Sequence, residues 1–381
     1  MKKVSGLVLF LGFFVLLQFG FVWTLLHVDR SSPRIQQKTP TLSSLPSTPP
    51  AVPCSTCKPC SSRLSPATAL PVEPPLFTLT VIVFTYNRIG GLHTLLHSLV
   101  TADYLERKDV RLHVFLDYPK KPETRLDGTR EYLDSFDWPH GPFEIHRRLG
   151  NAGLKKNIME SWYPRKDDEV AAFFEDDIEV SHEWFRWVNG GMLQYFASSS
   201  TVDPKLLGLS LYRPIHDELS GRDVRKPTND GSPFLLQQPC SWGAVYFPQP
   251  WRKFRRWYDE HRGESAELVD PNKPNVRPSS NTWDSASSWK KYLIKLMYVE
   301  GWFMVYPNFG GSTVLSTNHL LPGVHNTPPK DLFELPLVPP MESMSDDDKR
   351  VLELFPPLTS LVTYDVMFKR VPSLMELHGY R

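Results

Sequence analysis

The sequence predicts an α/β domain with a mostly parallel central sheet and flanking helices, preceded by a transmembrane helix and a disordered stem. From residue 77 onward, apolar runs rich in β-branched and aromatic residues alternate with helix-like stretches, as in α/β proteins. Residues 4–28 are almost continuously apolar, as a membrane span must be. Residues 29–75 are rich in Pro, Ser and Thr, a composition that cannot bury enough apolar surface to fold.

Composition narrows the class of protein. The 381 residues suffice for one large domain or two ordinary ones. A net charge of +1 argues against a nucleic-acid binder that works through bulk charge. The 11 Trp, 14 Tyr and 22 Phe indicate a sizeable core.

The N-terminal apolar run predicts a signal anchor. About 25 residues at ~1.5 Å each exceed the roughly 30 Å of a bilayer's hydrocarbon core. A cleaved signal peptide is the alternative, but no small-residue cleavage site follows the run. Lys2 and Lys3 place residues 1–3 in the cytosol and the rest of the chain in a lumen, although Arg30 and Arg34 oppose that orientation.

Three of the four cysteines lie close together in the stem. Cys54, Cys57 and Cys60 form a C-x2-C-x2-C cluster, whereas Cys240 stands alone. A structural zinc site normally needs four ligands. In an oxidising compartment such a cluster favours disulfides over metal, with a disulfide-linked dimer as one arrangement.

The main folded domain is expected at 76–330, and its first half shows the clearest alternation of strands and helices. Strands are expected at 77–86, 110–117, 143–148 and 170–174, with helices at 90–104, 124–136 and 153–162 between them. Ligands of such sheets bind outside the carboxyl ends of the strands. Asn87, Asp117 and Asp177 are expected at that edge.

The second half of the region is less regular. Helices are expected at 182–196, 251–261 and 283–300, strands at 206–212 and 302–306, and loops at 262–282 and 310–325. Residues 331–381 are Pro-rich and then acidic, and are expected to form a peripheral C-terminal extension.

The stretch that organises the chain is AAFFEDDIEV, residues 171–180. An apolar strand ends there in Glu175, Asp176 and Asp177, and buried carboxylates need a compensating cation. Such oxygens suit Mg²⁺ or Mn²⁺, which in turn could hold a phosphate-bearing donor. The alternative is a solvated acidic turn between a strand and a helix.

These features together resemble the Golgi type II glycosyltransferases of the GT-A fold. FTYNR at 84–88, an Asp at the end of the second strand and the acidic triplet carry the likeness. FEDDIEVSHEWF, 174–185, is closely similar to the motif of the N-acetylglucosaminyltransferase I and O-mannose-linked GlcNAc-transferase group. The first strands are equally similar to the broad GT2-type families. The likeness covers about 77–325 and is strongest at 171–190.

The resemblance implies a metal-dependent inverting glycosyltransferase that moves a sugar, with GlcNAc and a UDP donor favoured, to a glycan or glycoconjugate hydroxyl. Asp177 would bind Mn²⁺ or Mg²⁺, and Asp284 would be the general base. The remaining donor-site residues would be Tyr86, Asn87, Arg88, Asp117, Glu175 and Asp176.

The likeness also implies acceptor residues, Trp242, Gly243 and His319. By the same likeness, His319 and His325 could contact the metal or the pyrophosphate. The structural alternatives are Trp242 as a core residue and the two histidines as surface-loop residues. Asp284 could equally cap a helix, and Asp117 end a strand.

Arg148, Lys155 and Lys156 either clamp the diphosphate or form a solvated helix start. The alternative function is a catalytically inactive lumenal binding or scaffold protein on the same frame.

Overall fold

The computed structural model describes residues 76–121, 128–197, 203–217, 219, 223–224, 231–270, 273–276, 288–321 and 334–380. All belong to one compact unit that spans residues 71–381. The expected anchor and stem and the stem cysteines lie outside the described residues. Within the part that is described, no helix is both long and apolar enough to cross a membrane.

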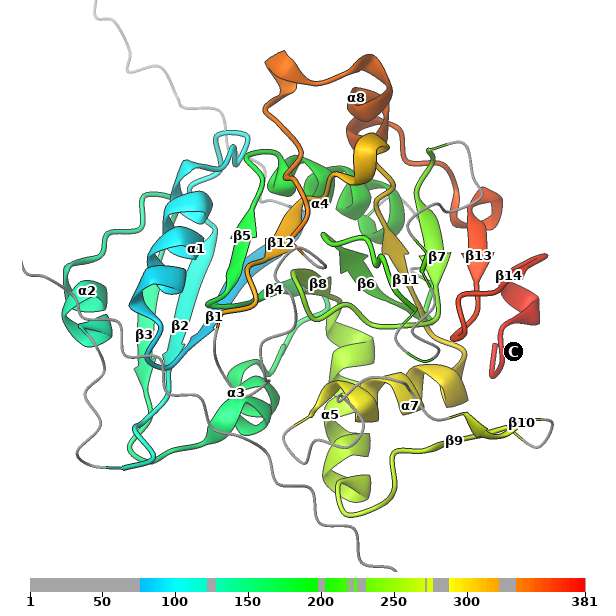
Figure 1. The fold of residues 1–381 in the computed structure, drawn as a ribbon, viewed down its shortest axis with the longest axis horizontal. Helices are drawn as coiled ribbons and strands as arrows, with labels where there is room; N and C mark the ends of the chain where they lie inside the picture. Colours follow the sequence, from blue (N-terminus) through cyan, green and yellow to red (C-terminus); the bar gives the residue numbers. More distant parts are fainter. Residues whose placement is uncertain are drawn as a thin grey trace, which may run out of the picture. The chain divides into compact units, whose positions relative to one another are not determined.

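A ten-stranded sheet runs through the described residues in the order β14-β13-β7-β11-β6-β8-β4-β1-β2-β3 (Figure 1). Its strands are β1 (Thr78–Thr85), β2 (Arg111–Leu116), β3 (Phe143–Arg147), β4 (Glu169–Glu175), β6 (Leu206–Ser210), β7 (Phe234–Leu236), β8 (Ala244–Tyr246), β11 (Phe303–Tyr306), β13 (Val362–Tyr364) and β14 (Arg370–Val371).

The parallel arrangement holds for one half of this sheet. β4, β1, β2 and β3 are parallel neighbours, as expected. In the other half, β8 is antiparallel to both β4 and β6, and β7 is antiparallel to β11. The expectation of a mostly parallel sheet is therefore wrong there. The two short strands within 234–247, β7 and β8, do not pair with each other, because β11 and β6 lie between them in the sheet. Each runs antiparallel to strands that are distant in the sequence, and local patterns carry no signal for such pairings.

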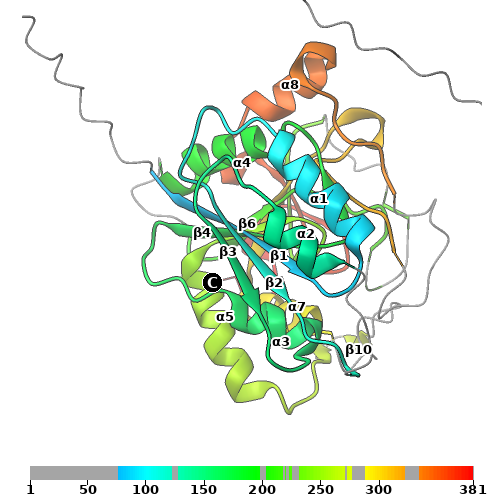
Figure 2. The same ribbon diagram turned by 90° about the vertical axis from the view of Figure 1, so that its left-hand side faces the viewer.

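Helices cover both faces of the sheet (Figure 2). α1, α2, α4 and α8 share one core with Leu79, Val81 and Val83 of β1, and α3, α5 and α7 share the other with Ile82 and Phe84. This alternation along one strand is the period of two that side chains of a sheet follow. The helices are α1 (Ile89–Thr101), α2 (Thr129–Ser135), α3 (Gly153–Ser161), α4 (Trp184–Met192), α5 (Pro248–His261), α7 (Lys290–Glu300) and α8 (Asp346–Glu353).

The C-terminal residues 334–380 belong to the core, which corrects the expectation that 331–381 are peripheral. β13 pairs in parallel with β7, and Val351 and Leu352 of α8 are buried on the α1 face. The Pro-rich composition indicated a loop, but Leu361–Tyr364 (LVTY) has the β-branched and aromatic residues of a strand.

Two small sheets lie in segments expected to be loops. β9 (Leu268–Asp270) pairs with β10 (Lys273–Val276) in 262–282. β12 (Ser316–Asn318) pairs antiparallel with β5 (Ile178–Val180) in the segment after the acidic triplet. The second pairing brings residues 316–319 beside the end of β4.

α1 approaches that same turn closely because it begins with two glycines. A Cβ on Gly91 would lie 2.2 Å from the carbonyl oxygen of Asp176 and 2.5 Å from Leu321 Cδ1. A Cβ on Gly90 would meet no atom within 4 Å. Gly91 thus permits a helix-to-turn contact that any side chain would separate.

We expect Gly91→Ala to lower the free energy of unfolding by about 1–3 kcal/mol, because a backbone carbonyl must move to admit the methyl group. Gly90→Ala is the matched control, and should leave stability unchanged or slightly higher, since alanine favours helix. Chemical denaturation of both variants measures the difference. Equal stabilities would contradict the close approach of α1 to the turn.

Candidate functional site

The acidic turn 175–177 is fixed from both sides. The Asp176 N–H donates to the carbonyl of Phe84 in β1 at 3.1 Å, and the His319 N–H donates to the carbonyl of Asp177 at 2.8 Å. The triplet therefore lies at the carboxyl ends of parallel β1 and β4, where ligands of α/β sheets bind.

Arg88 bridges two of the three acids. Its Nη2 contacts Asp176 Oδ1, and its Nη1 lies 2.9 Å from Asp177 Oδ2. Nη1 also donates to the carbonyl of Leu321 at 3.3 Å. The second oxygen of Asp176 accepts hydrogen bonds from the Thr85 hydroxyl at 2.8 Å and the Tyr86 N–H at 3.4 Å. Both oxygens of Asp176 are thus committed to β1 and the residues that follow it.

Burial dominates the electrostatics of this pair. It raises the pKa of Asp176, and the attraction of Arg88 only partly offsets that rise. Burial lowers the pKa of Arg88, but the charges of Asp176 and Asp177 outweigh it and leave the pKa raised. Arg88 is therefore a fixed cation, and its charge offsets part of the cost of burying Asp176.

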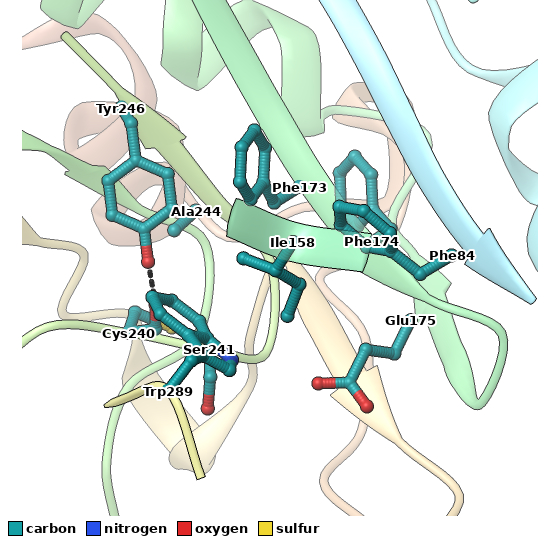
Figure 3. A pocket seen from close by; sticks show the side chains of 10 residues that line it. All are labelled: Phe84, Ile158, Phe173, Phe174, Glu175, Cys240, Ser241, Ala244, Tyr246 and Trp289. Carbon is teal, nitrogen blue, oxygen red and sulfur yellow. Dashed lines mark hydrogen bonds between the residues drawn. The ribbon is translucent and has the colours of Figure 1, made fainter. Parts of the chain in front are cut away.

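Glu175 points elsewhere. It lines a pocket whose other walls are mostly apolar, and Figure 3 shows its carboxylate directed away from the rings of Phe84 and Phe173. Burial, and then the negative charge of Asp177, raise the pKa of Glu175 from 4.5 to about 8. The Glu175 carboxyl accordingly holds a proton at neutral pH. The lining residues are Phe84, Ile158, Phe173, Phe174, Glu175, Cys240, Ser241, Ala244, Tyr246 and Trp289.

A divalent cation fits this turn at one point. Asp177 Oδ1 has a single long contact, 3.4 Å from the Asn318 amide nitrogen, whereas Oδ2 is paired with Arg88. The acids do not form a closed cage, because Arg88 lies between Asp176 and Asp177. Mg²⁺ is commonly bound through one or two carboxylates together with substrate phosphates and water, and Asp177 Oδ1 is the oxygen of the two aspartates with the weakest contact to the protein.

The Asp117 carboxylate forms hydrogen bonds within the protein. Its carboxylate accepts hydrogen bonds from the N–H groups of Ala152 and Gly153, at 2.8 Å each, and from the Asn151 amide at 3.3 Å. It also accepts from the Tyr118 N–H at 2.8 Å. An anion at a helix N-terminus is stabilising. Asp117 thus anchors the start of α3 to the end of β2, at the edge where it was expected.

The other expected donor-site residues lie nearby. Tyr86 follows β1, and its hydroxyl accepts a 3.4 Å hydrogen bond from the Lys120 N–H. Asn87 lies in the turn between β1 and α1 and is half-buried. The base candidate Asp284 and His325 fall outside the described residues.

His319 is held by two acids that the sequence did not connect with it. Its Nε2 lies 2.9 Å from Glu179 and its Nδ1 2.9 Å from Glu334. Glu179 belongs to strand β5, directly after the acidic triplet. The His319 side chain is therefore directed at carboxylates on either side of β12.

Trp242 and Gly243 form a tight bend before β8. Trp242 is half-buried and packs edge-on against Tyr212, with ring centroids 4.9 Å apart. Gly243 has φ +83°, and a Cβ there would lie 2.6 Å from Ser316 Oγ. This bend adjoins Ser241 and Ala244 of the Glu175 pocket.

The three basic residues suggested as a diphosphate clamp interact with their own surroundings. Arg148 donates to Asn157 at 2.7 Å and pairs with Glu160 at 2.8 Å. Lys156 lies 3.8 Å from Glu160. Lys155 lies 5.9 Å from the ring centre of Tyr292. Their contacts favour the helix-start interpretation.

Several residues at the site were missed. Thr85, Asn318 and the Leu321 carbonyl contact the acidic turn or Arg88, and Trp289 lines the Glu175 pocket. Thr85 could have been found from the sequence, because it ends the first strand directly before Tyr86, Asn87 and Arg88. Asn318, Leu321 and Trp289 approach only through tertiary pairing, for which the sequence pattern offers no signal.

Comparison with known proteins adds partial similarities. A family model described as the SPBC1E8.03c C-terminal domain matches residues 91–262, a range that includes the acidic turn but not Arg88. No curated protein matches the chain.

Solved structures are similar at low identity. Staphylococcus aureus TarS 1–349 in complex with UDP-GlcNAc is 12% identical over 61% of this chain and 56% of that one, with a TM-score of 0.32. GalNAc-T7 with UDP, GalNAc and Mn²⁺ is 13% identical over 61% of this chain and 43% of that one, with a TM-score of 0.37. The mannosyltransferase PcManGT from Pyrobaculum calidifontis, with GDP-Man and Mn²⁺, is 14% identical over 60% of this chain and 54% of that one, with a TM-score of 0.33.

The chain spans about half the length of these solved chains. The similarity to these structures, at TM-scores of 0.32–0.37, assigns neither a fold family nor an activity to this chain. It does not extend to the specific likeness with the N-acetylglucosaminyltransferase I group, which stays a prediction from residues 174–185.

We expect the protonated Glu175 to make the folded state less stable as pH rises. Between about 4.5 and about 8 the folded protein holds a proton that the unfolded chain releases, so the free energy of unfolding falls through this window. Glu175→Gln removes this contribution and should flatten the dependence.

Denaturation from pH 5 to 9, in EDTA and without nucleotide, measures the effect as the difference between wild type and variant. The two curves should converge at the acidic end and separate toward pH 8 and above, with the variant more stable. A constant difference across the range would show that Glu175 is already ionised at pH 5.

Proposed function

We propose that this chain is a glycosyltransferase that moves a sugar from a nucleotide-sugar donor to a hydroxyl of a glycan or glycoconjugate. One observation carries the proposal. Arg88, Asp176 and Asp177 form a charged constellation at the carboxyl ends of two parallel strands, beside a pocket that contains Glu175 and aromatic rings.

The charged constellation suits a diphosphate. A guanidinium that pairs with two carboxylates offers the same forked donors to phosphate oxygens. The Asp177 arm of Arg88 is the more exchangeable, because Asp177 has fewer other partners than Asp176. Arg88 is accordingly proposed to turn from Asp177 to the donor diphosphate, where its charge would stabilise the leaving group.

Asp177 would then hold a divalent cation, Mn²⁺ or Mg²⁺, through its freed carboxylate. When bound, such an ion supplies charge stabilisation to the departing diphosphate. Asp176 keeps its bonds to Thr85 and Tyr86 and would hold the turn in place.

The adjoining pocket is small, with room for about one water molecule, so the sugar is proposed to lie at its opening, beside the half-buried Glu175 and Ser241. The Glu175 carboxylate can accept a hydrogen bond from a sugar hydroxyl. The Ser241 hydroxyl at the same pocket offers a second polar contact.

The finer identity of the reaction rests on the likeness of residues 174–185. It favours UDP-GlcNAc as donor, inversion at the anomeric carbon and Asp284 as the base that deprotonates the acceptor. The apolar run 4–28 supports a single-pass type II protein of the Golgi membrane with the catalytic region lumenal. Digestion of the region by protease added outside sealed Golgi vesicles would refute that topology.

The contact of Arg88 with both aspartates also favours a second candidate, a binding protein on the same frame. If Arg88 never leaves Asp177, no cation site opens, and the protein would bind a ligand without transferring a sugar.

The experiment is a thermal-shift screen of nucleotide sugars with and without Mn²⁺, followed by assays of donor hydrolysis and transfer. Wild type should bind one donor in a Mn²⁺-dependent way and turn it over. Asp177→Ala should lose at least tenfold in Mn²⁺-dependent donor affinity, because it removes the proposed ion ligand.

Asp346→Ala, at an exposed Asp of α8, is the matched control and should behave as wild type. Full activity of Asp177→Ala, with an unchanged melting temperature, would reject the metal site. Donor binding without hydrolysis or transfer would favour the binding protein, and no binding of any donor would reject both.

A further inference from the structure

A second group of ionisable side chains lies on the edge strands β2 and β3, apart from the acidic turn. His113 pairs in register with Glu144, and Phe115 with His146. Side chains two residues apart on a strand share a face, so the two histidines, Glu144 and Phe115 lie on the same side of the sheet. The His146 ring stacks on Phe115 with centroids 4.4 Å apart.

The potential ligand atoms are close together. His113 Nδ1 lies 3.2 Å from His146 Nε2, and His146 Nε2 lies 3.6 Å from Glu144 Oε2. All three ligand atoms lie within 4.8 Å of one another. In a tetrahedral site with metal–ligand bonds of about 2.0–2.1 Å, two ligand atoms are about 3.3–3.4 Å apart. The two measured separations bracket that value.

The ionisation of the group also suits a metal. Burial lowers the pKa of His113, and the attraction of Glu144 only partly opposes this. Burial likewise lowers the pKa of His146, with Glu144 opposing it and Arg148 adding to it. Neutral imidazoles keep the lone pair that binds a metal. Glu144 is more than half exposed, so an ion can enter from solvent.

We propose that His113, Glu144 and His146 bind a transition-metal ion of the Zn²⁺ class. Two imidazole nitrogens and one carboxylate oxygen are the three protein ligands, and water completes the tetrahedron. The site is independent of the proposed glycosyl transfer and of Asp177.

The ion would fasten the outermost strand of the sheet. β3 is the last strand in the order, and its five residues are all half-buried or exposed, so little apolar burial holds it. A metal that joins β2 to β3 would restrain this edge. It would also restrain the segment that leads from β3 into α3, whose first residues are tied to Asp117.

The test uses full-length, untagged protein in detergent, stripped with EDTA and titrated with Zn²⁺ or Co²⁺. Wild type should bind about one equivalent of Zn²⁺ at this site. Co²⁺ should give the visible absorption of a tetrahedral complex, and Zn²⁺ should raise the melting temperature.

Two variants and two controls decide the outcome. His146→Gln and the surface variant Glu144→Gln should each weaken Zn²⁺ binding at least tenfold and abolish the tetrahedral Co²⁺ spectrum. His261→Gln, at the end of α5, and Asp177→Ala should leave both unchanged. Zn²⁺ affinity that is unaltered in His146→Gln and Glu144→Gln, or that disappears in Asp177→Ala, would overturn the proposal.

Discussion

The Arg88 guanidinium holds Asp176 and Asp177 together at the end of β4, and the geometry of the candidate site depends on this contact. Asp176 is almost wholly buried, and its bonds from Arg88, Thr85 and the Tyr86 N–H offset part of the cost of burying its charge. Breaking a buried ion pair by removing one partner typically costs about 3–5 kcal/mol. The same contact joins the turn after β1 to the turn after β4, which is the edge where a ligand of this sheet would bind.

The arrangement makes the two aspartates unequal. Asp176 is fixed by several neutral and charged donors, whereas Asp177 has Arg88 on one oxygen and a long contact to Asn318 on the other. A ligand with phosphate oxygens can compete for Arg88 at little structural cost on the Asp177 side. The Glu175 side chain instead lines the neighbouring pocket, and burial raises the pKa of its carboxyl to about 8. In the proposed function, the triplet would thus provide an anchor in Asp176 and an ion ligand in Asp177.

Much of this organisation was predictable from the chain, for identifiable reasons. An apolar run that ends in three acids places them at a strand terminus, and the alternation of strands and helices in 77–175 predicts parallel β4, β1, β2 and β3. Local patterns did not predict that Arg88 would contact both aspartates. They also missed that Asp117 would start α3, because the partners of that carboxylate lie some 35 residues later. β13 was missed because proline dominates its neighbourhood, and the cluster on β2 and β3 because it exists only in register.

In the proposed function, Arg88 exchanges an aspartate for the diphosphate of a nucleotide sugar. The most direct measurement is a crystal structure of the protein with UDP and Mn²⁺. We predict that the diphosphate contacts the Arg88 guanidinium, that the ion is bound to Asp177, and that Asp176 is still bonded to Thr85. A nucleotide bound elsewhere, or Arg88 unchanged between the two aspartates with no contact to the diphosphate, would contradict it.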